Sequence, residues 1–138
     1  MIVLDTNVLS ALMRDTPDPT VAQWLDGQPA ESIWTTSITV FEIRTGIDLL
    51  ENGRRREQLD ETFSQLLAED LNGRVQSFDL TAALAAGTIA ASRQRVGRAV
   101  EIRDVQIAGI ANSRHAILAT RNTRHFVATG VELVNPWG

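Results

Sequence analysis

Three carboxylates stand at positions where the sequence pattern predicts apolar side chains. Asp5 directly follows the apolar run 2–4, and Glu42 falls on the apolar arc of a helix predicted over residues 38–51. Asp104 shares a helical stripe with small and aliphatic neighbours. A carboxylate on a core-facing surface costs free energy unless a cation or hydrogen bonds compensate it. The three acids are therefore candidates for a functional site.

Each of these acids also has a purely structural interpretation. Asp5 or Asn7 could cap the helix that follows the first strand, a common role for both residue types. Glu42 could extend from the rim of its apolar arc to solvent, and Asp104 lies in the first turn of its helix, where the helix dipole favours an anion. Glu101, just before that helix, could join the same acidic cluster or cap the helix.

Short apolar runs, which predict strands, alternate along the chain with longer stretches of helical periodicity. This alternation is typical of an α/β domain, here with three α/β/α layers around a central parallel sheet of four to five short strands. No repeat or linker interrupts it, so a single domain is expected over residues 1–138. The strands are expected at 1–5, 32–36, 74–78, 117–120 and 131–134. The helices are expected at 7–14, 20–26, 38–51, 54–71, 80–96 and 102–115.

The predicted topology brings the acids to one edge of the sheet. The first strand ends at Asp5, and the helix that carries Glu42 starts where the strand 32–36 ends. The helix that carries Asp104 runs antiparallel to the strand after it, so its start lies at the same edge, as does the turn 120–122. Like charges at this distance need a cation to remain ionised. With oxygen ligands and no cysteine, the ion that fits is hard and octahedral, Mg²⁺ or Mn²⁺.

Charge and composition exclude several other classes of chemistry. The net charge is −4, but residues 93–124 carry seven Arg against two acids, a basic segment that could bind phosphates or simply form a solvated surface. The absence of Lys excludes a Walker A phosphate loop and a Schiff-base mechanism, and the absence of Cys excludes thiolate metal sites. Neither a membrane-spanning apolar window nor a signal peptide pattern occurs, so a cytoplasmic location is expected.

Four short motifs follow one another along the chain. Residues 1–7 read Met-Ile-Val-Leu-Asp-Thr-Asn, residues 36–46 and 102–111 surround the second and third acids, and residues 118–126 read Leu-Ala-Thr-Arg-Asn-Thr-Arg-His-Phe. In order and spacing they resemble the motifs of PIN-domain ribonucleases, especially VapC toxins and the related FitB proteins. The ending Asn135-Pro136-Trp137 resembles that of the plasmid-stability subgroup. The similarity covers essentially the whole chain.

The resemblance implies a PIN fold, a homodimer and a Mg²⁺- or Mn²⁺-dependent endoribonuclease that acts as the toxin of a toxin–antitoxin pair. Structured tRNA is the expected substrate, and the products are expected to carry 5′-phosphate and 3′-hydroxyl ends. The resemblance also implies a VapB- or FitA-type antitoxin, whose C-terminal segment blocks the active site. Toxin and antitoxin together are expected to bind operator DNA through the antitoxin, in an assembly that can be larger than one dimer.

The resemblance also assigns roles to individual residues. Three acids correspond to the metal-binding residues of the family: Asp5, Glu42 and Asp104. The polar residues expected to support them are Thr6, Asn7 and Thr120. Asn122 stands where many members have a fourth Asp, so we expect it to orient a water or phosphate oxygen, and we expect a second metal to bind weakly. Candidates for contacts with the RNA backbone are Arg103, Arg121 and Arg124.

Two alternatives to a ribonuclease stay open. One is a PIN domain kept as a non-catalytic partner that acts through its antitoxin in DNA-bound autoregulation, an alternative to which Asn122 gives weight. The other is a phosphatase with an aspartate nucleophile after its first strand. That chemistry requires an acid or threonine where this chain has Asn7, and a Lys that the chain lacks.

Several residues that could attract a functional interpretation receive a structural one. His115 and His125 have no partner motif for general-base chemistry. The run 54–56 of three Arg is interpreted as a solvated helix start, and the three Trp residues as core or dimer contacts. The Ala-rich stretch 82–91 predicts close packing of its helix, with the dimer interface as one place for it.

Overall fold

A five-stranded parallel sheet lies at the centre of the molecule, with the strand order β3-β2-β1-β4-β5. The computed structural model describes residues 1–138. In the middle of the sheet, Ile2 pairs with Ile33 on one side and with Ile117 on the other. The expected parallel sheet of short strands is therefore confirmed. The strands are β1 (Ile2–Leu4), β2 (Ile33–Thr36), β3 (Val75–Gln76), β4 (Ile117–Ala119) and β5 (Glu132–Val134).

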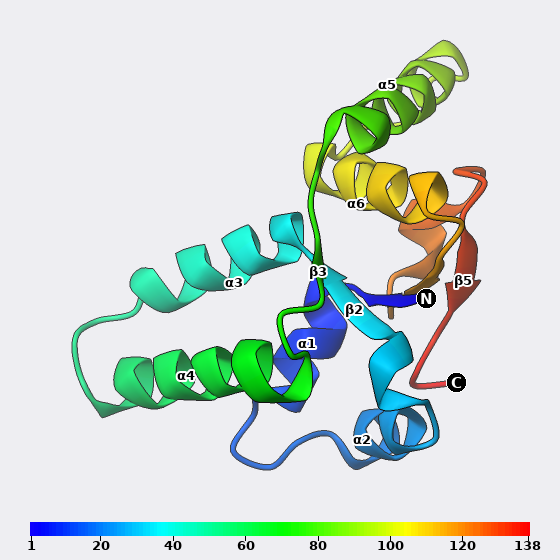
Figure 1. Cartoon of the computed structure of the whole chain (residues 1–138). Coiled ribbons are helices and arrows are strands. Elements are labelled where there is room, and N and C mark those ends of the chain that lie inside the picture. Colours follow the sequence, from blue (N-terminus) through cyan, green and yellow to red (C-terminus); the bar gives the residue numbers. More distant parts are fainter.

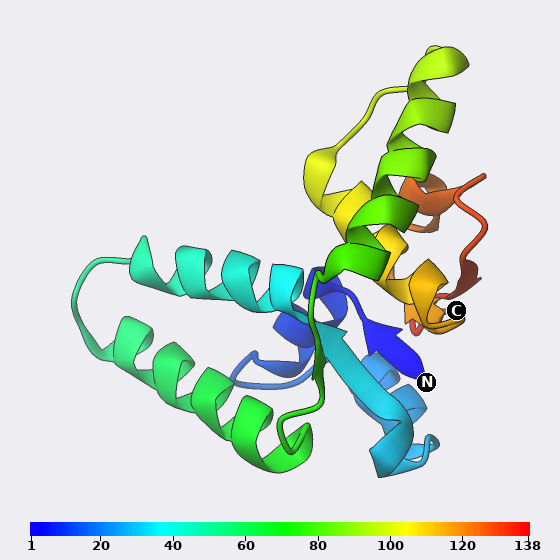
Figure 2. The ribbon, with the colours of Figure 1, turned by 45° about the horizontal axis from the view of Figure 1, so that its top comes forward.

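Helices cover both faces of this sheet, so the expected three-layer α/β/α architecture is also confirmed (Figure 1). One apolar cluster joins the sheet to α1–α4, and a second joins it to α5, α6 and a 3₁₀ turn near the C-terminus. The antiparallel pair α3 and α4 extends away from the sheet in both views (Figures 1 and 2). The helices are α1 (Thr6–Leu12), α2 (Pro19–Asp26), α3 (Ser37–Asp48), α4 (Arg54–Gln65), α5 (Leu80–Arg95) and α6 (Ile102–Ser113). The short helical turns are η1 (Ala30–Ser32), η2 (Leu66–Asp70) and η3 (Thr123–Phe126).

Side-chain caps fix where the helices next to the strands begin. At the end of β2, the Thr36 side chain accepts a hydrogen bond from the backbone N–H of Thr39 and starts α3. At the end of β1, Asp5 accepts the N–H of Thr6 and starts α1. An N-cap oxygen compensates an N–H group that has no partner within the helix. Strand and helix therefore meet at a defined residue on the edge of the sheet that carries the acids.

The helices α5 and α6 pack against each other unusually closely. A Cβ atom added to Gly109 of α6 would lie 2.6 Å from both the Ala82 carbonyl oxygen and the Ala86 Cβ of α5. Glycine on one helix and alanine on the other let the two backbones approach, as the Ala-rich stretch predicts. This contact fixes α6, whose first turn carries Asp104.

Some element boundaries differ from the sequence-based expectation. The helix expected over 54–71 is α-helical only to Gln65 and continues as the π-helical turn η2. Leu49, expected on the apolar arc of α3, is 81% exposed, because α3 ends at Asp48 and the residue lies beyond its regular periodicity. The turns η1 and η3 were not expected. None of the helices is both long and apolar enough to cross a membrane.

Candidate active site at the carboxyl edge of the sheet

Asp5 is the most buried acid of the site, with 5% of its surface exposed. Its Oδ1 accepts the N–H of Thr6 at 2.8 Å. Its Oδ2 accepts the Thr120 hydroxyl at 2.7 Å and the Asn7 side-chain amide at 3.2 Å. Burial raises the pKa of Asp5, and these hydrogen bonds, first that from Thr120, oppose the rise without cancelling it. Asp5 is thus both the cap of α1 and a carboxylate held in one orientation by the expected supporting residues.

Glu42 reaches the same edge from the second turn of α3. The Thr6 hydroxyl donates a hydrogen bond of 3.1 Å to its Oε1, and the same hydroxyl lies 3.1 Å from that of Thr39. The Arg103 guanidinium lies 3.5 Å from its Oε2. Thr6 therefore links two of the predicted acids, through its backbone N–H to Asp5 and through its hydroxyl to Glu42. Glu42 points toward this hydrogen-bond network.

Asp104 completes the set from the first turn of α6. Its backbone N–H donates to the Glu101 side chain, which caps the helix, and its carboxylate lies 3.2 Å from Nδ1 of His125. Burial, and then the negative charges of Glu101 and Asp5, raise the pKa of Asp104 to about 6, although His125 opposes this rise. The structure thus places Asp104 within electrostatic reach of Asp5.

The turn after β4 is tied to the start of α1. Asn7 accepts the backbone N–H of Arg121 at 3.1 Å, and the Thr120 hydroxyl accepts the backbone N–H of Asn122 at 3.1 Å. The Asn122 side chain makes no hydrogen bond within the chain and does not cap the η3 turn that follows. The structure therefore brings Asn7, Thr120 and Asn122 to the edge occupied by Asp5, and it leaves the Asn122 amide free to bind a water or a ligand.

The side chains at this edge fit a hydrated divalent cation. No group of three or more His, Asp or Glu side chains in the chain is close enough to hold an ion unaided. Mg²⁺, however, keeps several waters and is usually held by one or two carboxylates. The charge of Asp5 raises the pKa of Asp104, and a cation between two such carboxylates would relieve that repulsion. Asp5 and Asp104 are thus the carboxylates that fit such an ion, and Thr6 links Glu42 to the same edge.

The arginines predicted to contact RNA have different neighbours. Arg103 pairs with Glu42, whereas the Arg121 guanidinium lies over the Trp137 ring, 4.8 Å from its centroid. Arg124 lines a second cavity beside Asp104. All three are exposed at the surface.

His125 was missed as a site residue by the sequence interpretation, which gave it a structural role. Its imidazole contacts Asp104, and its charge also lowers the pKa of Asp5. The sequence carries no signal for this contact, because it depends on the short η3 turn. Arg55 is likewise more than part of a solvated helix start, since its side chain lines a large cavity.

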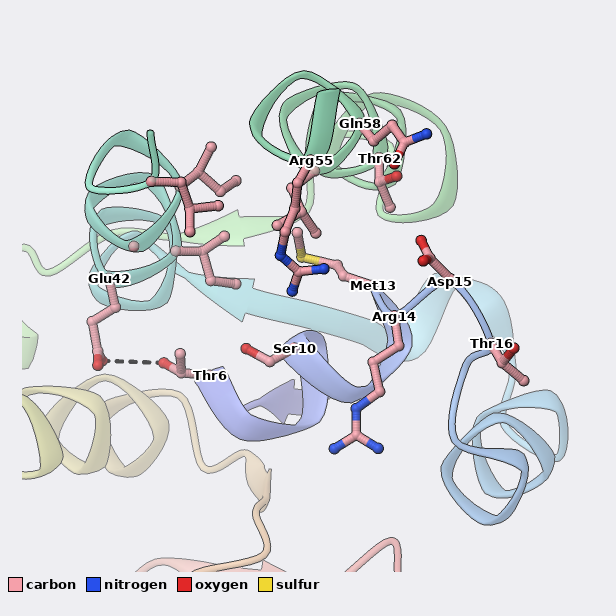
Figure 3. Close-up of a pocket in the computed structure, with 15 residues that line it drawn as sticks. Thr6, Ser10, Met13, Arg14, Asp15, Thr16, Glu42, Arg55, Gln58 and Thr62 are labelled. Carbon is pink, nitrogen blue, oxygen red and sulfur yellow. Dashed lines mark hydrogen bonds between the residues drawn. The ribbon is translucent and has the colours of Figure 1, made fainter. Parts of the chain in front are cut away.

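That cavity, of about 670 Å³, opens between α1, α3 and α4 and has Thr6 and Glu42 at one end. Figure 3 shows the hydrogen bond between these two residues and the Arg55 guanidinium further along the same hollow. Five apolar residues form the other part of its lining. The groove therefore offers apolar contact, two arginines and the carboxylates of Asp15 and Glu42 to a ligand that approaches from this side.

Residues 2–131 match the PIN domain family. The chain belongs to this family. This PIN domain is 40% identical over 137 residues to the plasmid stability protein StbB of Pseudomonas syringae pv. tomato, covering 99% of both chains. It is 36% identical over 137 residues to the VapC ribonuclease Y4jK of Sinorhizobium fredii, covering 99% of this chain and 98% of that one. It matches a chain in the structure of FitAB bound to the IR36 DNA fragment with a TM-score of 0.91 and 36% identity, covering 100% of this chain and 96% of that chain.

Proposed function

We propose that this PIN domain is a Mg²⁺- or Mn²⁺-dependent endoribonuclease, the toxin of a toxin–antitoxin pair, with structured tRNA as its substrate. The observation that carries the proposal is the pair of partly buried carboxylates of Asp5 and Asp104, whose pKa values are both raised. Two acids that repel each other at the edge of a sheet lower the stability of the fold, and a bound cation relieves this repulsion. Such pairs are therefore candidates for functional sites. The family relationship to a VapC ribonuclease supports the same activity.

The residues of the site have distinct roles in this proposal. When bound, the divalent ion would lower the pKa of a coordinated water and neutralise charge on the phosphoryl group. Asp5 and Asp104 would bind the ion, and Thr120 holds the Asp5 carboxylate in position through its 2.7 Å hydrogen bond. Glu42, oriented by Thr6, accepts a hydrogen bond from the attacking water. Asn122 orients a second water or a phosphate oxygen.

We place the RNA backbone over the basic side chains around the acids. Arg103, Arg121 and Arg124 supply positive charge there, and each contact with a phosphate would make binding salt-sensitive. Hydrolysis would leave a 5′-phosphate and a 3′-hydroxyl. An RNA substrate also agrees with the expected cytoplasmic location.

The cavity between α1, α3 and α4 supports an inhibitory partner. A segment of a VapB- or FitA-type antitoxin would pack against its apolar wall and pair acidic groups with Arg14 and Arg55. Such a segment would end beside Glu42 and block the acids. We propose that a homodimer of this chain forms that complex and that the antitoxin attaches it to operator DNA, as the DNA-bound FitAB structure suggests.

Cleavage of end-labelled tRNA by purified protein free of antitoxin tests the activity, with Mg²⁺, Mn²⁺ and EDTA in separate reactions. We expect discrete fragments that require a metal and disappear in the Asp5→Ala variant. Glu51→Ala is the matched control, because Glu51 is an exposed acid that follows α3, the helix of Glu42. Intact RNA in every reaction, from folded protein that still binds its antitoxin, would contradict the ribonuclease. Such a result would favour a non-catalytic partner, which Asn122 in place of a fourth acid would then explain.

A further inference from the structure

A second cavity, of about 430 Å³, opens beside Asp104 between the end of α5, the start of α6 and the η3 turn. Its charged lining comes from four cationic or imidazole side chains and two acids: Arg93, Arg98, Arg124, His125, Glu101 and Asp104. Only two hydrophobic residues line it. The cavity is therefore a recess lined mainly by charged residues, and it shares Asp104 with the proposed ion site.

The positive charge of this recess is available to a ligand. Of its two acids, Glu101 is held in place by the backbone N–H of Asp104, and Asp104 contacts His125. Arg98 and Arg124, in contrast, take part in none of the six salt bridges of the chain and donate no side-chain hydrogen bond. Two exposed guanidinium groups without a carboxylate partner thus face the same hollow.

Arg93 holds in place the segment that carries Arg124. Its guanidinium donates hydrogen bonds to the carbonyl oxygens of His125 at 2.6 Å and Val127 at 3.0 Å. These bonds attach the η3 turn to the end of α5, more than thirty residues earlier in the chain. Arg124 and His125 are therefore held against the start of α6. The recess is a formed part of the fold.

We propose that this recess binds a phosphate group of the RNA strand next to the phosphodiester that is cut, with Arg98 and Arg124 as its principal ligands. The inference rests on the proposed ribonuclease function, because an RNA strand positioned at Asp5 and Asp104 must pass its neighbouring phosphates over the surface around them. Guanidinium groups bind phosphate oxygens through paired hydrogen bonds.

The two cavities beside the acids are lined by different kinds of residue. The cavity on the Glu42 side has five hydrophobic lining residues among fifteen, which gives a peptide apolar surface to bury. The recess beside Asp104 has only Ala99 and Val105. Charged side chains make up most of its lining residues, and a polyanion offers them a phosphate at every nucleotide.

The test compares the double variant Arg98→Ala/Arg124→Ala with wild-type protein in binding a short labelled RNA in EDTA, where cleavage does not interfere. Arg95→Ala is the matched control, because Arg95 is an exposed arginine in the last turn of α5 and does not line the recess. We expect affinity to fall roughly ten-fold at low salt. We also expect the slope of log affinity against log salt concentration, measured over roughly 50 to 200 mM, to become shallower by about 0.7 for each lost contact. Circular dichroism and thermal unfolding verify that both variants fold.

The outcomes separate this inference from the proposed activity. An unchanged affinity and salt slope in the double variant, while wild-type protein cleaves RNA, would overturn the phosphate site and leave the ribonuclease intact. Loss of binding to the antitoxin alone, with RNA binding unchanged, would also overturn it, because the recess would then serve the protein partner. A shallower slope from a protein that cleaves nothing would support the phosphate site and contradict only the hydrolysis. With Arg124→Lys in place of Arg124→Ala, part of the salt dependence of RNA binding should return, because Lys keeps the charge but loses the paired hydrogen-bond geometry of Arg.

Discussion

The surroundings of Asp104 disfavour the ionised form of its carboxyl group. Burial and the charges of Glu101 and Asp5 raise its pKa from 3.8 to about 6, while His125 opposes the rise. Between about pH 4 and pH 6, the folded protein without metal therefore binds a proton at Asp104 that the unfolded chain has already released. Residues that raise one another's pKa in this way favour the metal-bound state, because a cation removes the repulsion that a proton otherwise removes.

We expect the free energy of unfolding of metal-free protein to carry a contribution from Asp104 that falls as pH rises from about 4 to about 6. Between these values the native state binds more protons at this group than the unfolded state does, so stability decreases as pH increases. Urea unfolding in EDTA at several pH values measures it, and Asp104→Asn should remove this part of the dependence. An Asp104→Asn variant that loses stability with pH as steeply as wild type would contradict the shifted pKa. Addition of Mg²⁺ at pH 7 should stabilise wild type more than the variant.

At the scale of the elements, the contact between α5 and α6 positions half of the site. α6 carries Arg103 and Asp104, and α5 carries Arg93, which holds the turn of His125. Gly109 allows the two helices to approach, and its neighbours Ala82 and Ala86 leave no room for a Cβ.

We expect Gly109→Ala to destabilise the protein by about 1–3 kcal/mol, because the added methyl group overpacks this contact. Gly87→Ala is the matched control on α5, since no atom lies within 4 Å of its added Cβ. In a helix interior that control should stabilise by roughly 0.5–1 kcal/mol. Urea unfolding measures both. Equal effects of the two substitutions would show that α5 and α6 can separate without cost.

The sequence predicts those parts of the site that local pattern encodes. Glu42 and Asp104 stand out because they interrupt apolar helical stripes, and Asp5 because it ends a buried strand. Local pattern does not predict the contact of His125 with Asp104, because this contact depends on hydrogen bonds from Arg93 that span more than thirty residues. The exposure of Leu49 was missed for a related reason, since the exact end of α3 is set by its C-cap and by packing with α4, which periodicity does not describe.

At the scale of the whole molecule, only some arginines of the basic segment 93–124 contribute to a positive surface. Arg114 is used inside the fold, where it pairs with Asp79 and joins α6 to the start of α5. Arg93 is likewise used to hold the η3 turn. The remaining arginines of the segment lie at the surface, several of them around Asp104, so a protein of net charge −4 presents a local positive surface beside its acids. A polyanion can therefore bind locally despite the overall charge.

Large apolar side chains are exposed on the surface near the starts of α3 and α5. Phe41 of α3 and Leu80 and Leu84 of α5 are 60%, 75% and 66% exposed. The two helices begin next to each other, since the N–H of Phe78 donates to the Ser37 hydroxyl at 3.1 Å (Figures 1 and 2). Leu80 and Leu84 are one turn apart and share a helix face. Monomeric proteins rarely expose contiguous apolar patches of large side chains, and interfaces of permanent homodimers are rich in them.

We expect this surface to be the interface of the homodimer that the family resemblance implies. Light scattering coupled to gel filtration should give wild-type protein a mass about twice the 15.2 kDa of one chain. Leu84→Glu should shift it toward the mass of one chain, because a buried charge without a partner is costly. Leu49→Glu is the matched control, since Leu49 is the most exposed of the large apolar residues and lies at the far end of α3 from α5 (Figure 1). A Leu84→Glu protein that stays dimeric would place the interface elsewhere, and dissociation by Leu49→Glu instead would move it to the tip of the α3–α4 pair.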